Sequence, residues 1–162
     1  MIVKHYPLKF RNLSIREFTD LIVIHHTGNP ADDDLSAEDI HKSHLRRGWS
    51  GIGYHFIIRK DGTIEAGRPF RTIGAHAYGF NSHSIGIMLS GNFEISTPTS
   101  EQLHSLQLLI KHLQMIYGNA DFTKLYINGG SIAMHRDLMP TLCPGTRFTL
   151  KMLEDVIHDK IE

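Results

Sequence analysis

The residues with the clearest capacity for chemistry are the single cysteine and a few of the histidines. Cys143 follows His135 by eight positions, 143 minus 135, and Pro140 and Pro144 restrict the segment around it. Prolines disfavour a helix and fix the backbone, so this segment is predicted to be a defined loop. A thiolate and an imidazole held close together are ligands that zinc prefers.

Two ligands do not complete a zinc site, and the pair His25 and His26 offers the best third ligand. Three protein ligands with an open fourth position are typical of catalytic zinc, because water must reach the metal. The combination therefore favours hydrolysis. Each residue alone has an ordinary explanation, since Cys143 could be a small buried apolar residue, His25 a core histidine and His135 a loop residue.

The histidine pair ends a continuous apolar run, Leu21–His26, which is typical of a strand buried on both faces. Side chains alternate between the two faces of a strand, so His25 and His26 point in opposite directions. Only one of the two can therefore face a cleft.

The rest of the chain alternates predicted helices and strands. The predicted helices cover residues 36–48, 99–118 and 150–161, and the further predicted strands cover residues 53–60, 63–67, 84–91 and 125–127. This alternation predicts an α/β fold, a single domain with a mixed, mainly open central sheet flanked by helices. Residues 1–20 are expected to form an N-terminal arm packed on the domain of residues 21–162.

Composition excludes several classes of function. Lysine plus arginine equals aspartate plus glutamate at 17 each, so the broad basic field of a nucleic-acid-binding protein is absent. A single cysteine cannot form an internal disulfide. No apolar stretch approaches the ~20 residues that membrane insertion requires, and the amino terminus does not resemble a signal peptide. The chain is therefore expected to be cytoplasmic as synthesised.

Several short segments form a further pattern, in a fixed order along the chain. They are Ile24-His25-His26-Thr27, Gly53-Tyr54-His55-Phe56-Ile57-Ile58, Gly74-Ala75-His76, Asn81, Ser84-Ile85-Gly86-Ile87, Gly91-Asn92-Phe93 and His135-Arg136-Asp137 with Cys143-Pro144-Gly145. Together they resemble the type-2 N-acetylmuramoyl-L-alanine amidases, a family that also contains the animal peptidoglycan recognition proteins and short phage amidases. The resemblance extends over residues 20–157.

The resemblance implies a zinc ion bound in a surface groove by His25, His135 and Cys143, with His26 turned to the other face. Two catalytic residues are also implied. Tyr54 matches a tyrosine whose hydroxyl lies near the metal and would hydrogen-bond the attacking water or the oxyanion. Thr141 falls where phage members often have lysine and recognition proteins often have threonine, and its hydroxyl could donate to the oxyanion.

The same resemblance places His76, Asn81 and Trp49 in the groove as substrate-binding residues. His44 could line this groove too, although packing in the core is the better interpretation for it. Recycling members of the wider family carry a glutamate at about the position of Met88, and a thioether cannot carry a proton. The general acid and base are therefore not assigned.

The function that follows from the resemblance is hydrolysis of the linear amide between the lactyl group of N-acetylmuramic acid and L-alanine in peptidoglycan. A phage or prophage endolysin that reaches the cell wall after release is expected, acting as a monomer. Two alternatives use the same fold: a non-catalytic peptidoglycan-binding module, and a regulatory protein that binds a cytoplasmic protein partner. The presence of all three ligand residues favours the enzyme, because binding-only members typically lack one of them.

Overall fold

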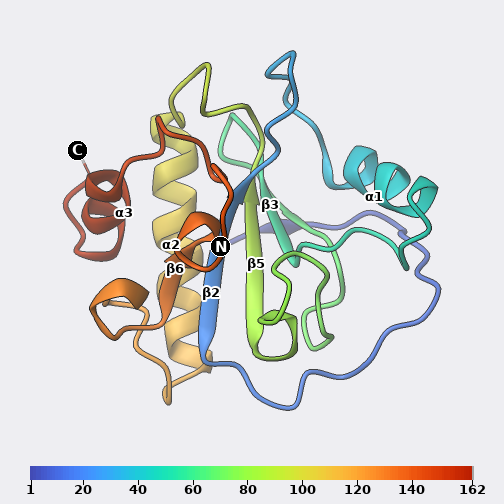
Figure 1. The fold of residues 1–162 in the computed structure, drawn as a ribbon, viewed down its shortest axis with the longest axis horizontal. Helices are drawn as coiled ribbons and strands as arrows, with labels where there is room; N and C mark the ends of the chain where they lie inside the picture. Colours follow the sequence, from blue (N-terminus) through green and yellow to red (C-terminus); the bar gives the residue numbers. More distant parts are fainter. Residues whose placement is uncertain (162) are drawn as a thin grey trace.

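The computed structural model describes residues 1–161, which form one six-stranded sheet with helices on both sides (Figure 1). The strands are β1 (Val3–Lys4), β2 (Leu21–His26), β3 (Phe56–Ile58), β4 (Ile64–Ala66), β5 (Ser84–Leu89) and β6 (Ile132–Met134). The helices are α1 (Ala37–Arg46), α2 (Ser100–Ile116) and α3 (Leu150–Ile157), with short 3-10 helices η1 (Asn81–His83), η2 (Tyr126–Asn128) and η3 (His135–Asp137).

The sheet is mixed and open, with the strand order β1-β4-β3-β5-β2-β6. The hairpin of β3 and β4 is antiparallel, and every other neighbouring pair is parallel. All six residues of β2 are buried, because this strand lies between β5 and β6. The predicted α/β class with a mixed, open sheet is confirmed.

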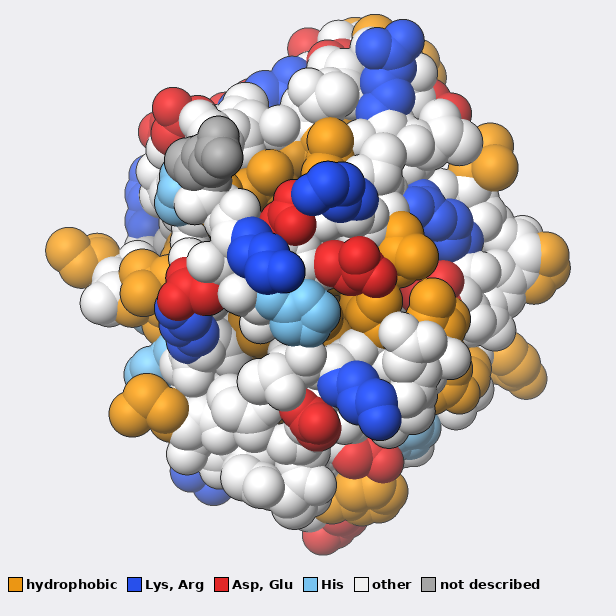
Figure 2. Space-filling view, turned by 90° about the vertical axis from the view of Figure 1, so that its left-hand side faces the viewer, with side chains coloured by type: hydrophobic (Ala, Val, Ile, Leu, Met, Phe, Trp, Pro, Cys, Tyr) orange, Lys and Arg blue, Asp and Glu red, His pale blue; other side chains and the backbone are white. Residues whose placement is uncertain are grey.

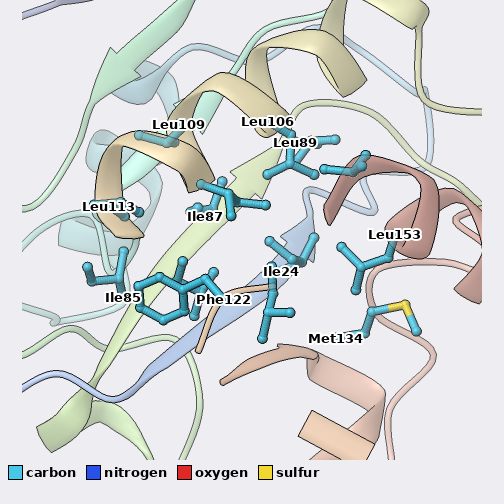
Figure 3. Close-up of a cluster of buried hydrophobic side chains, with 14 of the residues drawn as sticks. Ile24, Ile85, Ile87, Leu89, Leu106, Leu109, Leu113, Phe122, Met134 and Leu153 are labelled. Carbon is cyan, nitrogen blue, oxygen red and sulfur yellow. The ribbon is translucent and has the colours of Figure 1, made fainter. Parts of the chain in front are cut away.

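The main hydrophobic core fills the space between one face of the sheet and helices α2 and α3. Alternate residues of β2 and β5, among them Ile24 and Ile87, face Leu106 and Leu109 of α2 and Leu153 of α3 (Figure 3). This face of β2 therefore serves stability.

The other face of the sheet carries the intervening side chains of β2. Leu21 and Val23 pack there with Ala77 and Ala133, in a smaller cluster that loops cover. His25 is the next residue on this face, at the carboxyl end of the strand. The alternation therefore separates His25 from the main core, as the sequence predicts.

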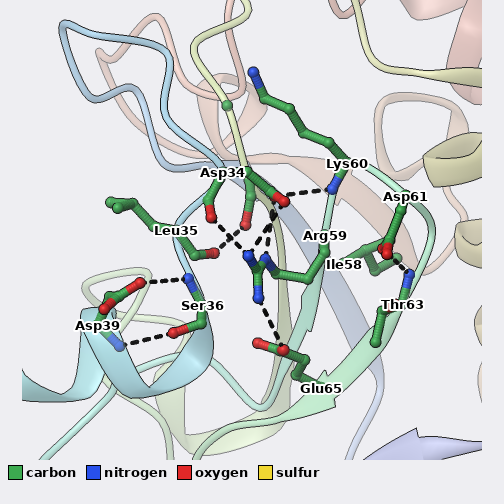
Figure 4. A network of polar contacts seen from close by, with 12 residues as sticks. Asp34, Leu35, Ser36, Asp39, Ile58, Arg59, Lys60, Asp61, Thr63 and Glu65 are labelled. Carbon is green, nitrogen blue, oxygen red and sulfur yellow. Dashed lines mark hydrogen bonds and ion pairs between the residues drawn. The ribbon is translucent and has the colours of Figure 1, made fainter.

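A buried carboxylate ties α1 to the β3–β4 hairpin, and Figure 4 shows its ion pair with Arg59. Glu65 of β4 is fully buried and pairs with Arg59 at 3.1 Å. The same carboxylate accepts hydrogen bonds of 2.8 Å from the Tyr6 hydroxyl in the N-terminal arm and from the backbone N–H of Ala37. Arg59 also pairs with Asp34 at 3.1 Å. One network thus joins the arm, the start of α1 and the β3–β4 hairpin.

Several elements differ from the sequence-based expectation. The stretch predicted as a strand at 125–127 lies largely in the 3-10 helix η2, which ends at Gly129 with a φ of +89°. The short strand β6 was not predicted. Within the N-terminal arm, Val3 and Lys4 form the edge strand β1 alongside β4. Strand β3 begins only at Phe56, because the backbone of Gly53 and Tyr54 bonds to Ala75 and Arg68 instead of to the sheet.

The surface shows acidic and basic side chains interspersed on the side of the molecule that carries α3 (Figure 2). Ion pairs join Lys111 to Asp159 at 3.2 Å and Lys151 to Asp155 at 2.8 Å. Among residues 1–161, no helix combines the length and the apolar character that crossing a bilayer requires.

Candidate metal centre

Three side chains that could hold a metal ion meet at the carboxyl end of β2. One nitrogen each from His25 and His135 and the sulfur of Cys143 all lie within 4.8 Å of one another. The His25 Nδ1 to Cys143 Sγ distance is 3.7 Å, and the two imidazole centroids are 4.5 Å apart. Ligands about 2.0–2.3 Å from a tetrahedral metal ion lie roughly 3–4 Å from each other, so His25 and Cys143 are already at ligand spacing and the group of three could hold a metal ion. No other such group occurs in the described part of the chain.

Strand pairing brings the two histidines together. β6 runs parallel to β2, with Ile24 opposite Met134. His25 and His135 are the next residues on the two strands' paths, and His135 starts the 3-10 helix η3. The short strand β6 is therefore what delivers the second histidine to the first.

Arg136 holds Cys143 close to the two histidines by closing the loop that follows η3. Its backbone N–H donates to the carbonyl of Cys143 at 2.8 Å. Its guanidinium donates to the carbonyls of Gly145 at 2.8 Å and Phe148 at 2.6 Å. Asp137 fixes the start of the loop, since its carboxylate accepts from the Met134 N–H at 2.9 Å. The motif His135-Arg136-Asp137 was part of the sequence pattern, but the structural roles of Arg136 and Asp137 were not predicted from it.

Burial controls the protonation of the group. It lowers the pKa of His25 well below its usual range, and the nearby His76 and His135 add to this effect. Burial also lowers the pKa of His135. It raises the pKa of the Cys143 thiol to about 11, against a hydrogen bond from the backbone of His26 and the charge of Arg136. Metal binding at this thiol must therefore release a proton.

Each imidazole has a second contact on the side away from the group. His25 Nε2 lies 2.9 Å from Nδ1 of His76, and His135 Nε2 lies 2.9 Å from the sulfur of Met139. A metal-ligating histidine usually gives its second N–H to a carboxylate, a backbone carbonyl or water. A histidine and a methionine hold those places here.

A groove of about 380 Å³ opens beside this centre. His44, Trp49, Tyr54, His76, Asn81 and His135 line part of it. Trp49 is 38% exposed, and its ring lies 4.5 Å from the ring of His44. His44 is buried and accepts the N–H of Gly53 through Nδ1, so it both packs in the protein and reaches the groove.

Tyr54 lies against the candidate ligands, with its ring centroid 5.0 Å from that of His25. Burial chiefly, and to a smaller extent the electrostatic effect of the neighbouring Cys143, raises the pKa of Tyr54, so its hydroxyl stays protonated and can donate. Thr141 lies in the ligand loop, where its hydroxyl accepts the N–H of Cys143 at 3.2 Å. Catalytic roles for both residues remain predictions.

The predicted substrate residues differ in their surroundings. The side-chain oxygen of Asn81 accepts the backbone N–H groups of His76 and Ala77, both at 2.9 Å, and so shapes the groove wall. His76 is only 9% exposed, and its ring nitrogens contact His25 and Ser84. Substrate binding by Trp49, His76 and Asn81 stays a prediction.

Arg47, Tyr78 and Met139 also line the groove and were not assigned from the sequence. Tyr78 is 89% exposed and follows His76 by two positions. Met139 follows His135 by four positions. Proximity to the assigned residues was the only sequence signal for these three.

Comparison with known proteins gives the same family as the sequence motifs. Residues 16–146 match the family described as N-acetylmuramoyl-L-alanine amidase. The endolysins of Klebsiella phage KP32 and Escherichia phage T7 are each 34% identical to this chain over 141 residues, which covers 84% of the chain and 85% of each relative.

Solved structures agree with this match. The N-acetylmuramoyl-L-alanine amidase LysC from Clostridium intestinale URNW superposes with a TM-score of 0.85 at 33% identity, covering 98% of both chains. Wild-type Drosophila PGRP-LB superposes with a TM-score of 0.70 at 27% identity, covering 88% of this chain and 90% of that one. The family matched by residues 16–146, the shared fold and the cluster of two histidines and a cysteine lead to one conclusion: the chain belongs to the N-acetylmuramoyl-L-alanine amidase family.

Proposed function

We propose that this protein is a zinc-dependent amidase that hydrolyses the amide between the lactyl group of N-acetylmuramic acid and L-alanine in peptidoglycan. The observation that carries the proposal is the meeting of His25, His135 and Cys143 beside a groove, in a member of this family. Three protein ligands are the number found in catalytic zinc sites.

The donor set suits zinc, because it combines two neutral imidazoles with one thiolate. When bound, zinc can lower the pKa of a coordinated water to about 7 and polarise a carbonyl. The protein holds the ligands through β2, β6 and the bonds of Arg136. Cys143 gives up its proton when the metal binds.

Two hydroxyls, those of Tyr54 and Thr141, would stabilise charge on the substrate carbonyl oxygen. Tyr54 remains a donor at neutral pH because burial raises its pKa. Thr141 accepts the N–H of Cys143 with one lone pair, and its own O–H remains available to donate. We assign both to the developing oxyanion, where a donor is worth most.

The groove would hold the sugar and the stem peptide. Trp49 offers a partly exposed aromatic surface. Asn81 uses its oxygen inside the protein, which leaves its amide N–H groups for substrate. His76 can contact substrate only through a ring edge, because both of its nitrogens are engaged.

Digestion of purified sacculi tests the reaction. The zinc-loaded protein is expected to release stem peptides with a free L-alanine amino terminus, identified by mass spectrometry, and no new sugar reducing ends. Treatment with a chelator should abolish release, and added zinc should restore it. Binding to sacculi without release would instead indicate a peptidoglycan-binding module.

Tyr54→Phe tests the oxyanion assignment. Loss of the hydroxyl is expected to lower kcat by about 10²–10³-fold, the usual effect of removing one oxyanion donor. The content of zinc and the KM should change little, since the ring remains beside His25. A wild-type kcat in this variant would exclude the role.

We further propose that the protein acts as an endolysin, on the wall of a host cell, after its release from the cytoplasm. The supporting observation is its similarity to phage endolysins along most of their length. A structure of a Drosophila PGRP-LB variant in complex with tracheal cytotoxin supports the use of the same fold for muropeptide binding. Co-expression with a membrane-permeabilising protein should lyse a bacterial host, whereas expression alone should not.

A further inference from the structure

We propose that His76 is the residue that positions His25: it accepts the Nε2–H of His25 and thereby keeps Nδ1 free and directed at the metal centre. The inference rests on the proposed zinc site and adds a residue to it. A histidine, supported by a serine on the neighbouring strand, would take the place that a carboxylate or carbonyl usually holds behind a ligand.

Three buried side chains form a continuous chain behind the centre. His25 Nε2 lies 2.9 Å from His76 Nδ1, and His76 Nε2 lies 3.2 Å from the hydroxyl of Ser84. The exposed fractions are 1% for His25, 9% for His76 and 0% for Ser84. Water therefore has little access to these contacts, and each ring nitrogen must use its protein partner.

The His76 ring lies in a space, here called its seat, that exists because Gly74 and Gly86 have no side chains. A Cβ at Gly86 would lie 2.6 Å from Cγ of His76, and one at Gly74 would lie 2.7 Å from its Cδ2. Real side chains do not approach so closely, so any larger residue would displace the ring. Gly86 therefore lets the His76 ring lie directly against strand β5, and Gly74 leaves room for the ring in its own loop.

Strand register places this seat beside His25. In the β2–β5 pair, Val23 lies opposite Gly86 and His25 lies opposite Met88. Because side chains alternate, Ser84, Gly86 and Met88 lie on the same face of β5. On this face Gly86 leaves a space between the side chains of Ser84 and Met88. The His76 ring fills this space and lies between Ser84 and His25.

The backbone of His76 is fixed as well. The Asn81 side chain accepts N–H groups from His76 and Ala77, which closes the turn that carries the histidine. Asn81 therefore holds the backbone of His76, while its ring packs on Gly86 and its Nε2 contacts Ser84. Such support is what a residue needs in order to orient another.

The proton arrangement follows from the partners. Each neutral imidazole carries one proton, so an Nε2–H on His25 requires a bare Nδ1 on His76 and an Nε2–H that donates to Ser84. Nδ1 of His25, which faces Cys143, is then a free lone pair. Within residues 1–161 no carboxylate bonds to His25, and Glu65, the one buried acidic residue there, bonds elsewhere.

Two amide variants of His76 distinguish a residue that orients His25 from one that only fills space beside it. His76→Asn puts an amide near the place of Nδ1, so it can still accept from His25. His76→Gln fills more of the seat and reaches toward Ser84, but lacks an acceptor at that place. We expect His76→Gln to weaken zinc binding by about 10–100-fold, the usual cost of losing such a contact, and His76→Asn to recover most of it. Competition with a chromophoric chelator measures both.

Tyr78→Ala is the matched control, because Tyr78 lies two positions away in the same groove wall and is 89% exposed. Its zinc affinity should equal that of the wild type. Equal zinc affinity in His76→Gln and the wild type, or a loss in His76→Asn as large as in His76→Gln, would overturn the inference.

A second readout needs no zinc. Nitrogen-15 NMR of the histidine rings in the metal-free wild type is expected to show the His25 proton on Nε2, and a mixture of both forms in His76→Gln. A His25 proton on Nδ1 in the wild type would also overturn the inference. Failure of the proposed function is distinct, because it would appear as a wild-type protein that takes up no zinc or leaves sacculi intact.

Discussion

Replacing Cys143 with serine is expected to remove bound zinc and the release of stem peptides together. Serine is almost the same size, so the loop closed by Arg136 should persist. Its hydroxyl does not ionise as a thiol does, and zinc strongly prefers the thiolate. Activity should fall by at least about 10³-fold, equivalent to about 4 kcal/mol of transition-state stabilisation. Metal analysis of the purified protein and the rate of sacculus digestion measure the two effects.

His104→Ala provides the control for Cys143→Ser. His104 is an exposed histidine on α2, and its ring bonds to the carbonyl of Ser100. Its removal should leave both zinc content and digestion rate unchanged. Wild-type release of stem peptides by the serine variant would show that Cys143 is not a ligand.

Glu65→Ala is expected to be the most damaging change outside the metal centre. It removes a fully buried carboxylate from Arg59 (Figure 4). It also leaves the Ala37 N–H and the Tyr6 hydroxyl without their acceptor. Breaking a buried ion pair from one side typically costs about 3–5 kcal/mol. The free energy of unfolding, measured by urea denaturation, should fall by that amount.

Two further variants serve as comparisons for Glu65→Ala. Glu65→Gln keeps the size and one oxygen acceptor, so it should cost less than Glu65→Ala. Glu38→Ala removes an exposed carboxylate, 44% accessible, from its pair with Lys42 on α1. Such a surface pair is worth about 0.3–0.5 kcal/mol. If Glu65→Ala were no more destabilising than Glu38→Ala, the buried network would not support the fold as described.

The elements that the sequence predicts well are those with strong local signals. The apolar run of β2 and the capping boxes of α1 and α2 are all found, with Ser36 and Thr99 as the N-caps. The turn at Asp61 and Gly62 joins β3 to β4, with Gly62 at a φ of +89°. In each case neighbouring residues determine the conformation, so no distant contact has to be known.

The short strands were less predictable, because their pairing depends on residues far away in the chain. β6 has three residues and forms by pairing with β2, and β1 has two and forms by pairing with β4. Neither is long enough to show a period of two. At 125–127, the apolar residues suggested a strand, but Gly129 ends a 3-10 turn there.

The candidate ligands could be named from residue types and family resemblance, whereas their support could not. His76 lies 51 positions from His25, and its place depends on the register that sets Gly86 opposite Val23. Arg136 acts through backbone carbonyls, which any sequence would offer. Such contacts become visible only when the strands are aligned in space.

The hydrogen bonds by which Arg136 closes the ligand loop affect how a metal ion can enter and leave the candidate centre. The bonds from this side chain to Gly145 and Phe148 join protein atoms to each other, so we expect the loop to keep its shape without a cation. Little conformational entropy then has to be lost when the ion arrives, unlike in zinc fingers, which fold only on binding. A metal ion at the candidate centre is therefore expected to be taken up late and removed reversibly without loss of the fold.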